Sequence, residues 1–342
     1  MYDLPSVRVG ALRMTARRAM GQLALPLEPP GLPVLDERAR GARFRELPVR
    51  RILNTPATTR MPFWSINPYV GCEFGCTYCY ARKTHAWAME RAGTVVHPQN
   101  AWQAFEHEIL VKRTAPDVLL RTLEPARLQG LTLMIGTATD PYQPAERKFL
   151  LTRRVLQTLL RFSGLRIGII TKSPLVARDI DVLRELSGRH EVSVNISLAS
   201  TDAALLKRIE ARSPAPHARL RALARLTSAG IEAGLLVAPI LPAISDSWSQ
   251  LAALMEAGKE AGARYVVGAA LRLGEAARTG FLPLLARDFP ELVERYERRY
   301  GTGIGVAKQY ERALERRLMS LQEAFGFPVH EGMRRKRQLE GG

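Results

Sequence analysis

The three cysteines of the chain lie close together, and their spacing constrains the fold more than any other feature. Cys72, Cys76 and Cys79 form the pattern C-x3-C-x2-C. Gly71 and Gly75 lie among them, and because glycine adopts backbone conformations that other residues avoid, the loop can bend back and bring the sulfurs together. Three neighbouring thiolates can hold a metal or a cluster. With only three, a four-iron cluster would keep one iron open to an outside ligand.

A structural zinc site is the main alternative for these cysteines. It would need a fourth ligand, for which the sequence offers His85 or His97. Structural zinc sites more often contain paired C-x2-C units. The spacing therefore favours the cluster.

The motif resembles the signature of radical S-adenosylmethionine (SAM) enzymes, in which an aromatic residue, here Tyr78, precedes the last cysteine. The resemblance implies that Cys72, Cys76 and Cys79 bind a [4Fe-4S] cluster, and that SAM chelates the open iron through its amino and carboxylate groups. It also implies that an electron donor such as flavodoxin or ferredoxin drives cleavage of SAM to methionine and a 5'-deoxyadenosyl radical. That radical abstracts hydrogen from the substrate. Tyr78 would lie near the adenine.

Size and composition predict one large α/β domain with extensions, because the 342 residues are 46% apolar. We expect no membrane span, since no run of about 18 apolar residues occurs. Clustered cysteines without a recognisable leader predict a cytoplasmic protein. The formal charge of +17 favours an anionic partner, with nucleic acid first. A generally arginine-rich surface is the alternative explanation for that charge.

Strand-like and helix-like segments alternate along most of the chain. Such alternation predicts parallel βαβ units, and about six units predict an incomplete barrel, because a closed one needs more. The radical SAM resemblance likewise implies an α/β fold with a partial (β/α)6 barrel. The predicted strands are 63–67, 105–112, 131–136, 165–171, 192–198, 231–240 and 265–270. The predicted helices are 80–90, 116–123, 147–162, 175–186, one capped by Asp202, 217–229, 248–261 and those within 277–327.

Three parts follow from this pattern. Residues 1–60 read as a basic, proline-containing N-terminal extension, and residues 61–273 as the partial barrel. Residues 274–342 read as a helical region that ends in a basic tail at 334–337. The basic arms either clamp phosphates or are simply solvated.

Candidate cofactor ligands come from the strand ends, because reactive groups of parallel barrels lie there. Lys172 is expected to pair with the SAM carboxylate, and Gly136 to let the backbone approach its methionine part. Asn195 and Ser197 share a strand face, being two residues apart. Arg208 resembles a family contact near the fourth helix, with a surface ion pair as the alternative. The full set of expected SAM contacts is Tyr78, Gly136, Thr137, Asp140, Lys172, Asn195, Ser197, Arg208 and Pro239.

The stretch from Asn67 to Arg82, together with the strand-end segments, resembles the spore photoproduct lyase-like branch of the family, many of whose members have no assigned activity. That lyase repairs a thymine dimer in DNA and uses a further cysteine to return a hydrogen atom. Here every cysteine belongs to the motif. A tyrosine (Tyr69, Tyr80 or Tyr142) would then return the hydrogen, or the reaction differs.

Three hypotheses about function stay open at this point. The first is a radical SAM enzyme that acts on nucleic acid, with Tyr80, Tyr142 and His85 as catalytic candidates. The second keeps the radical chemistry but acts on a peptide or small metabolite. The third is a non-catalytic, metal-bearing protein that binds nucleic acid. For His85, a local hydrogen-bonding role is the alternative.

Overall fold

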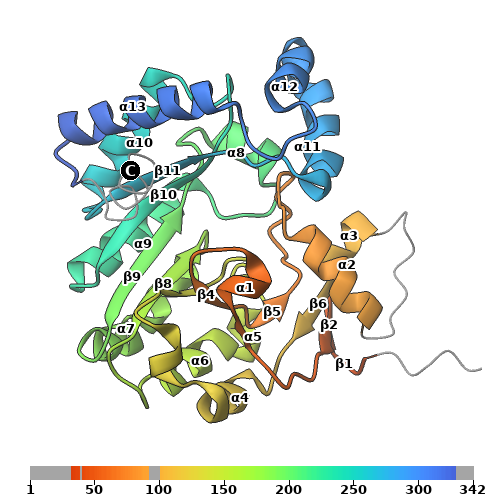
Figure 1. Cartoon of the computed structure of the whole chain (residues 1–342), viewed down its shortest axis with the longest axis vertical. Coiled ribbons are helices and arrows are strands. Elements are labelled where there is room, and N and C mark those ends of the chain that lie inside the picture. The colour runs from red at the N-terminus through yellow and green to blue at the C-terminus, as the bar shows by residue number, and fades with distance from the viewer. Residues whose placement is uncertain (1–31, 39–40, 92–100, 329–342) are drawn as a thin grey trace, which may run out of the picture. The chain divides into compact units, whose positions relative to one another are not determined.

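Six parallel strands form most of the larger sheet in this computed structural model, which describes residues 32–38, 41–91 and 101–328. They are β4 (Trp64–Ile66), β7 (Leu133–Ile135), β8 (Arg166–Thr171), β9 (Glu191–Ser197), β10 (Ala233–Ile240) and β11 (Val266–Ala270). The sheet order is β11-β10-β9-β8-β7-β4-β3, and β3 (Leu53–Asn54) is antiparallel to β4. Within the described residues β11 and β3 are the two edges, so the sheet does not close (Figure 1). The fold is thus the expected α/β type with a partial (β/α)6 barrel.

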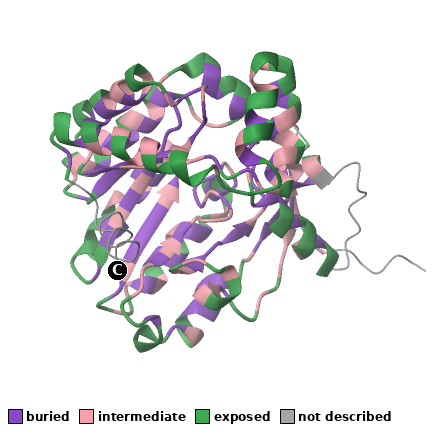
Figure 2. Ribbon diagram, turned by 45° about the horizontal axis from the view of Figure 1, so that its top comes forward, coloured by how far each residue is buried: buried purple, intermediate pink, exposed green. Residues whose placement is uncertain are grey.

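Helices cover the outer face of this sheet, because each lies in the connection between parallel strands (Figure 1). Alternate residues of the central strands are buried and apolar, among them Ile167, Ile169, Val194 and Ile196. The buried strands and the exposed outer surfaces of the helices are distinguished in Figure 2. The connecting helices are α4 (Ala115–Thr122), α6 (Leu151–Leu159), α7 (Ile180–Ser187), α8 (Ala203–Ile209), α9 (Pro216–Ser228) and α10 (Trp248–Glu260).

Most predicted elements are present, and Asp202 caps α8 as expected: its carboxylate accepts hydrogen bonds from the N–H groups of Ala204 and Leu205. Two predicted helices are interrupted. The helix at 147–162 is divided into α5 (Glu146–Phe149) and α6, because Leu150 has a left-handed φ of 49°. The helix at 175–186 begins as the 3-10 turn η3 (Pro174–Asp179) before α7.

The predicted strand at 105–112 is wrong in its first half. Residues up to His107 belong to α3 (Ala101–His107), and only β6 (Glu108–Val111) is a strand. The physical reason is the length of the partner: β2 (Arg43–Glu46) pairs with β6 from Arg43↔Glu108 to Glu46↔Val111 and goes no further. Strand geometry thus begins where a partner strand becomes available.

The smaller sheet has the order β1-β2-β6-β5, with β1 (Val34–Glu37) and β5 (Tyr69–Val70) at its edges. It takes in β1 and β2 of the predicted N-terminal extension, whereas β3 of that extension belongs to the larger sheet. Arg45 donates a 2.7 Å hydrogen bond to Glu108, which ties β2 to β6 through side chains as well. All described residues fall in one compact unit that begins at Leu32. The boundary at residue 60 stays a prediction.

The C-terminal helices are α11 (Glu275–Asp288), α12 (Val293–Tyr300) and α13 (Lys308–Ala324). Helix α13 lies against β11 and α10. Gln322 of α13 donates a 2.7 Å hydrogen bond to the carbonyl of Val266, and Leu318 fills the space beside Gly268. In the described part of the chain no helix is long and apolar enough to cross a membrane. The predicted basic tail lies outside the described residues.

Candidate functional site

The cysteine loop follows β5 and leads into α2 (Arg82–Arg91), and backbone hydrogen bonds fix it on two sides. Cys72 N–H donates to the carbonyl of Phe105 (2.8 Å), and Thr77 N–H donates to that of Ile209 (3.0 Å). Gly71 has a φ of 86°, and a Cβ there would lie 2.9 Å from the Phe105 oxygen. Only glycine therefore fits this turn, which brings the loop over the strand ends.

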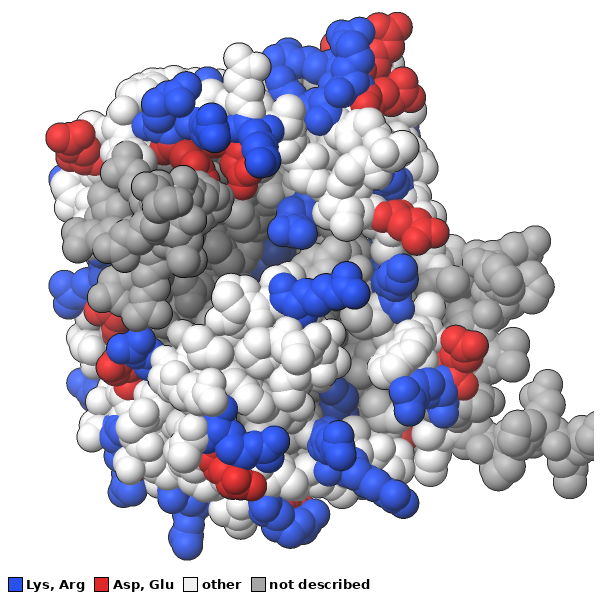
Figure 3. All heavy atoms as spheres, viewed as in Figure 1, with Lys and Arg blue, Asp and Glu red and all other residues white. Residues whose placement is uncertain are grey.

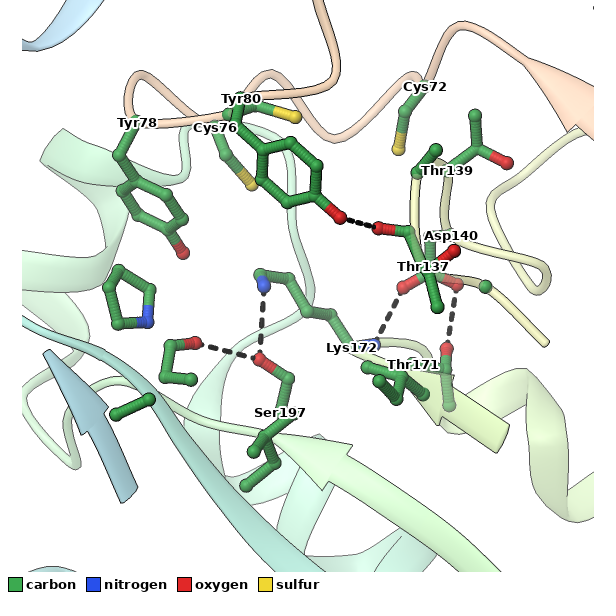
Figure 4. Close-up of a pocket in the computed structure, with 18 of the residues that line it drawn as sticks. Cys72, Cys76, Tyr78, Tyr80, Thr137, Thr139, Asp140, Thr171, Lys172 and Ser197 are labelled. Carbon is green, nitrogen blue, oxygen red and sulfur yellow. Dashed lines mark hydrogen bonds between the residues drawn. The ribbon is translucent and has the colours of Figure 1, made fainter. Parts of the chain in front are cut away.

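All three cysteines line one cavity of about 320 Å³ at the carboxyl ends of the parallel strands. In Figure 4, Cys72 and Cys76 lie on the loop above the cavity, and Lys172 reaches toward them from below. The cavity thus joins the cysteine loop to the strand ends. Among its other lining residues are Phe63, Tyr78, Tyr80, Gly136, Thr137, Thr139, Asp140, Thr171, Lys172, Ser197, Pro239 and Arg272.

Cys72 is buried, Cys76 and Cys79 are half-buried, and none of the three forms a disulfide. Burial raises the pKa of all three thiols. The pKa of Cys76 rises to about 12, although the nearby Lys172 charge acts to lower it. Bare thiolates are therefore unfavourable here, whereas bonds to iron would stabilise them in their deprotonated form.

A single zinc ion fits the site less well than a cluster. His85 does not line the cavity, because its Nε2 atom bonds the carbonyl of Glu108 at 2.7 Å. His97 lies outside the described residues. Among the described side chains no three His, Cys, Asp or Glu converge as ligands of one ion would. Three thiols spaced along one cavity wall suit a cluster, in which each binds a different iron.

Asp140 and Lys172 connect two neighbouring strand ends. The Asp140 carboxylate accepts hydrogen bonds from Thr171 Oγ1 and Lys172 N, both at 2.7 Å. Burial raises the pKa of Asp140, and these hydrogen bonds oppose the rise. Lys172 Nζ donates to Ser197 Oγ at 3.0 Å, as Figure 4 shows. The ammonium group is therefore held inside the cavity, where it can meet an anionic group.

A buried ionic network lies behind Tyr78 and was missed among the predicted site residues. Glu210 is fully buried and accepts hydrogen bonds from Tyr78 and Arg219. Lys172 Nζ lies 3.7 Å from it. Burial alone would raise the pKa of Glu210, but Lys172 and Arg219 outweigh burial and lower it to about 2. The sequence did indicate a buried charge here, because Arg219 lies on the apolar face of α9 with Ala222, Leu223 and Leu226.

Gln143 and Glu146 are fully buried beneath the cysteine loop. The Gln143 amide donates to the carbonyl of Gly71 (3.1 Å) and accepts from Glu73 N–H (3.0 Å). Glu146 accepts a 2.5 Å hydrogen bond from Tyr69. These groups hold the loop in place.

Four of the predicted site residues do not reach the cysteine cavity. Tyr142 is fully buried beside Gln143 under the cysteine loop and does not line the cavity. His85 bonds the backbone as described above. Arg208 is exposed and lies over the Phe289 ring, 4.9 Å from its centroid. Asn195 donates to the carbonyl of Ile169 and lines a separate cavity. Hydrogen bonding and packing outside the cavity account for all four positions.

Gly136 does line the cavity, but its lack of a side chain has a packing reason. With a φ of 91°, it would carry a Cβ only 2.5 Å from the Ile170 carbonyl and from Pro141 Cδ. Protein atoms, and not only a ligand, therefore require glycine here.

Comparison with known proteins gives a consistent result. The model of the radical SAM superfamily matches residues 66–258. An uncharacterized protein of Mycobacterium tuberculosis is 32% identical over 318 residues, which cover 90% of this chain and 91% of that protein. One of Methanocaldococcus jannaschii is 31% identical over 181 residues, covering 53% of this chain and 61% of the other. A solved spore photoproduct lyase mutant with dinucleoside spore photoproduct has a TM-score of 0.60 at 16% identity, over 82% of this chain and 79% of the other. That likeness shows the fold alone.

The Glu210 network generates a prediction about stability. We expect Arg219→Met to lower the free energy of unfolding by about 3 kcal/mol, because it leaves a buried carboxylate with less compensation. The double variant Arg219→Met/Glu210→Gln is expected to recover much of this loss, since it removes the buried charge as well. Urea unfolding followed by circular dichroism measures both. A single variant as stable as the unaltered protein would contradict the role of this pair.

Proposed function

The chain belongs to the radical SAM superfamily, whose members use a [4Fe-4S] cluster and SAM, and we propose that it abstracts hydrogen from a nucleic acid. Family membership supports an enzyme. The substrate proposal rests on the positively charged residues that line the cysteine cavity and a second cavity beside it. The charged residues that line them are Lys172, Arg272, Lys112 and Asp140, and the Asp140 carboxylate is occupied by hydrogen bonds.

We assign the cofactor positions from the lining of the cysteine cavity. Cys72, Cys76 and Cys79 would hold the cluster, and Lys172 would pair with the SAM carboxylate. When bound, the cluster and SAM supply a 5'-deoxyadenosyl radical that takes a hydrogen atom from the substrate. Tyr78, Thr137, Ser197 and Pro239 line the same cavity and would position SAM. An external electron donor such as flavodoxin or ferredoxin completes the proposal.

An anionic polymer also fits the charge of the molecule as a whole. The sequence carries 50 Lys and Arg against 33 Asp and Glu. Lys and Arg side chains are spread over the face shown in Figure 3, over α12 and α13 as well as near its centre. Such a distribution attracts polyanions at long range. If the substrate were a duplex, the target nucleotide would have to leave the stack to enter the cavity.

Tyr80 is our candidate for the hydrogen donor to the product. It lines the cysteine cavity, and its hydroxyl bonds the carbonyl of Thr137. The other phenols considered, Tyr69 and Tyr142, are fully buried, and neither lines that cavity. With all three cysteines assigned to the cluster, a phenol O–H is the remaining candidate donor at this position.

The cluster assignment predicts the behaviour of a cysteine variant. Anaerobically reconstituted protein should carry about four irons per chain, and Cys76→Ala should lose iron, visible absorbance and reductive cleavage of SAM together. Thr77→Ser is the matched control, because it alters the neighbouring residue and leaves every thiol. Iron content and SAM cleavage at control levels in Cys76→Ala would refute the assignment.

The Tyr80 assignment predicts a selective loss. Tyr80→Phe should bind the cluster and cleave SAM, yet form the final product about tenfold more slowly, equivalent to a barrier about 1.4 kcal/mol higher. Tyr142→Phe removes a buried phenol outside the cavity and should form product normally. Liquid chromatography with mass detection measures 5'-deoxyadenosine and product separately. Unchanged product formation in Tyr80→Phe would rule out this donor.

The substrate class is tested by incubating the reduced holoenzyme and SAM with DNA oligomers, RNA oligomers or a mixed peptide pool. We expect an oligonucleotide to stimulate 5'-deoxyadenosine formation and to change in mass. Salt should weaken its binding, because phosphate contacts release counterions. Stimulation by peptides alone would show that the substrate is not a nucleic acid.

A further inference from the structure

A second cavity of about 390 Å³ adjoins the cysteine cavity. The two share Phe63, Tyr80, Thr137, Ala138 and Thr139 as lining residues, so Tyr80 forms part of the wall of both. The second cavity lies among α1 (Pro56–Thr59), α2 and the residues that flank β4. A substrate that reacts in the first cavity therefore has room to extend into the second.

Lys112 is the charged residue among those that line this second cavity. It directly follows β6, and its main-chain N–H bonds the carbonyl of Pro68 at 3.2 Å. Its Nζ donates one hydrogen bond, to the carbonyl of Asn67 at 2.8 Å. An ammonium group has three N–H donors, and the structure pairs this one with no carboxylate of the described residues. Within the part of the chain that the structure describes, this charge thus lacks an anionic partner.

Burial of this amine has a cost that a purely structural role does not explain. Burial lowers the pKa of Lys112 to about 8, and no charged group among the described residues offsets this shift. A methionine would fill the same volume without that cost. An anion that enters the cavity would provide the missing counter-charge and accept the free N–H donors.

The rest of the lining suits a nucleotide. Trp87 of α2 lines the cavity and is 59% exposed, with the Arg91 guanidinium carbon 4.7 Å from its ring centroid. Exposed aromatic rings stack on the bases of single strands. Asn54, Thr58 and Thr59 add polar groups to the same wall.

We propose that this second cavity holds a nucleotide adjacent to the reacting one, with its phosphate paired to Lys112 and its base against Trp87. The inference rests on the proposed function and specifies where the nucleic acid strand is held. Lys112 is then a binding residue and takes no part in the chemistry at the cysteine cavity.

The test uses the reconstituted holoenzyme with SAM and a short fluorescent single-stranded DNA. Lys112→Met should weaken binding about tenfold and reduce the slope of log affinity against log salt by about 0.7, as expected for one lost phosphate contact. Lys83→Met is the matched control, because Lys83 is 78% exposed and lies 3.8 Å from Glu275 outside both cavities. SAM cleavage without DNA should be equal in Lys83→Met and the unaltered protein.

A second measurement needs no substitution at Lys112. Acylation of lysines in the unaltered holoenzyme, read by mass spectrometry, should be slowed at Lys112 by phosphodiester DNA but not by the uncharged methylphosphonate analogue. Lys83 serves as the internal reference. Protection by both oligomers would overturn the phosphate pairing.

The remaining outcomes separate this inference from the proposed function. DNA that binds with the same affinity and salt slope in Lys112→Met, and leaves Lys112 open to acylation, overturns the inference alone. If neither DNA nor RNA binds the unaltered holoenzyme, the nucleic-acid substrate and this cavity's role both fall.

Discussion

A buried negative charge holds the site together. Glu210 lies just after α8, its carboxylate contacts Arg219 of α9 and Tyr78 of the cysteine loop, and Lys172 at the end of β8 lies nearby. A carboxylate removed from water is costly unless cations and hydrogen-bond donors surround it. Satisfying this one group therefore fixes three elements relative to one another. The aromatic ring before the last cysteine is thereby positioned beside the Lys172 ammonium, whose Nζ lies 5.7 Å from the ring centroid.

The cysteine loop is supported in the same way from its other side. Gln143 satisfies backbone groups of Gly71 and Glu73, while Arg212 donates a 2.7 Å hydrogen bond to the carbonyl of Glu73. These contacts come from segments far away in the sequence. The loop's shape is thus imposed by the folded barrel more than by its own residues, so the thiols can be arranged before a cluster binds.

The sequence allowed the partial barrel to be predicted because alternating strands and helices, and the cysteine spacing, are local signals. The end of β6 that faces α3 was predicted wrongly, since it depends on the length of β2, a long-range pairing. The rule that reactive groups lie at the ends of parallel strands led to Asp140, Lys172 and Ser197, which do line the cavity. The same rule could not show that Tyr142 lies beneath the loop, or that Asn195 lines a different cavity, because both depend on side-chain packing between elements.

Gln322 affects the open edge of the larger sheet at β11. An edge strand presents backbone groups that invite pairing with a strand of another molecule. Here the amide of α13 bonds the carbonyl of Val266, and Leu318 packs over Gly268. Helix α13 thus lies against the edge strand β11 and satisfies one of its backbone carbonyls. This edge of the sheet is therefore less open to pairing with a strand of another molecule.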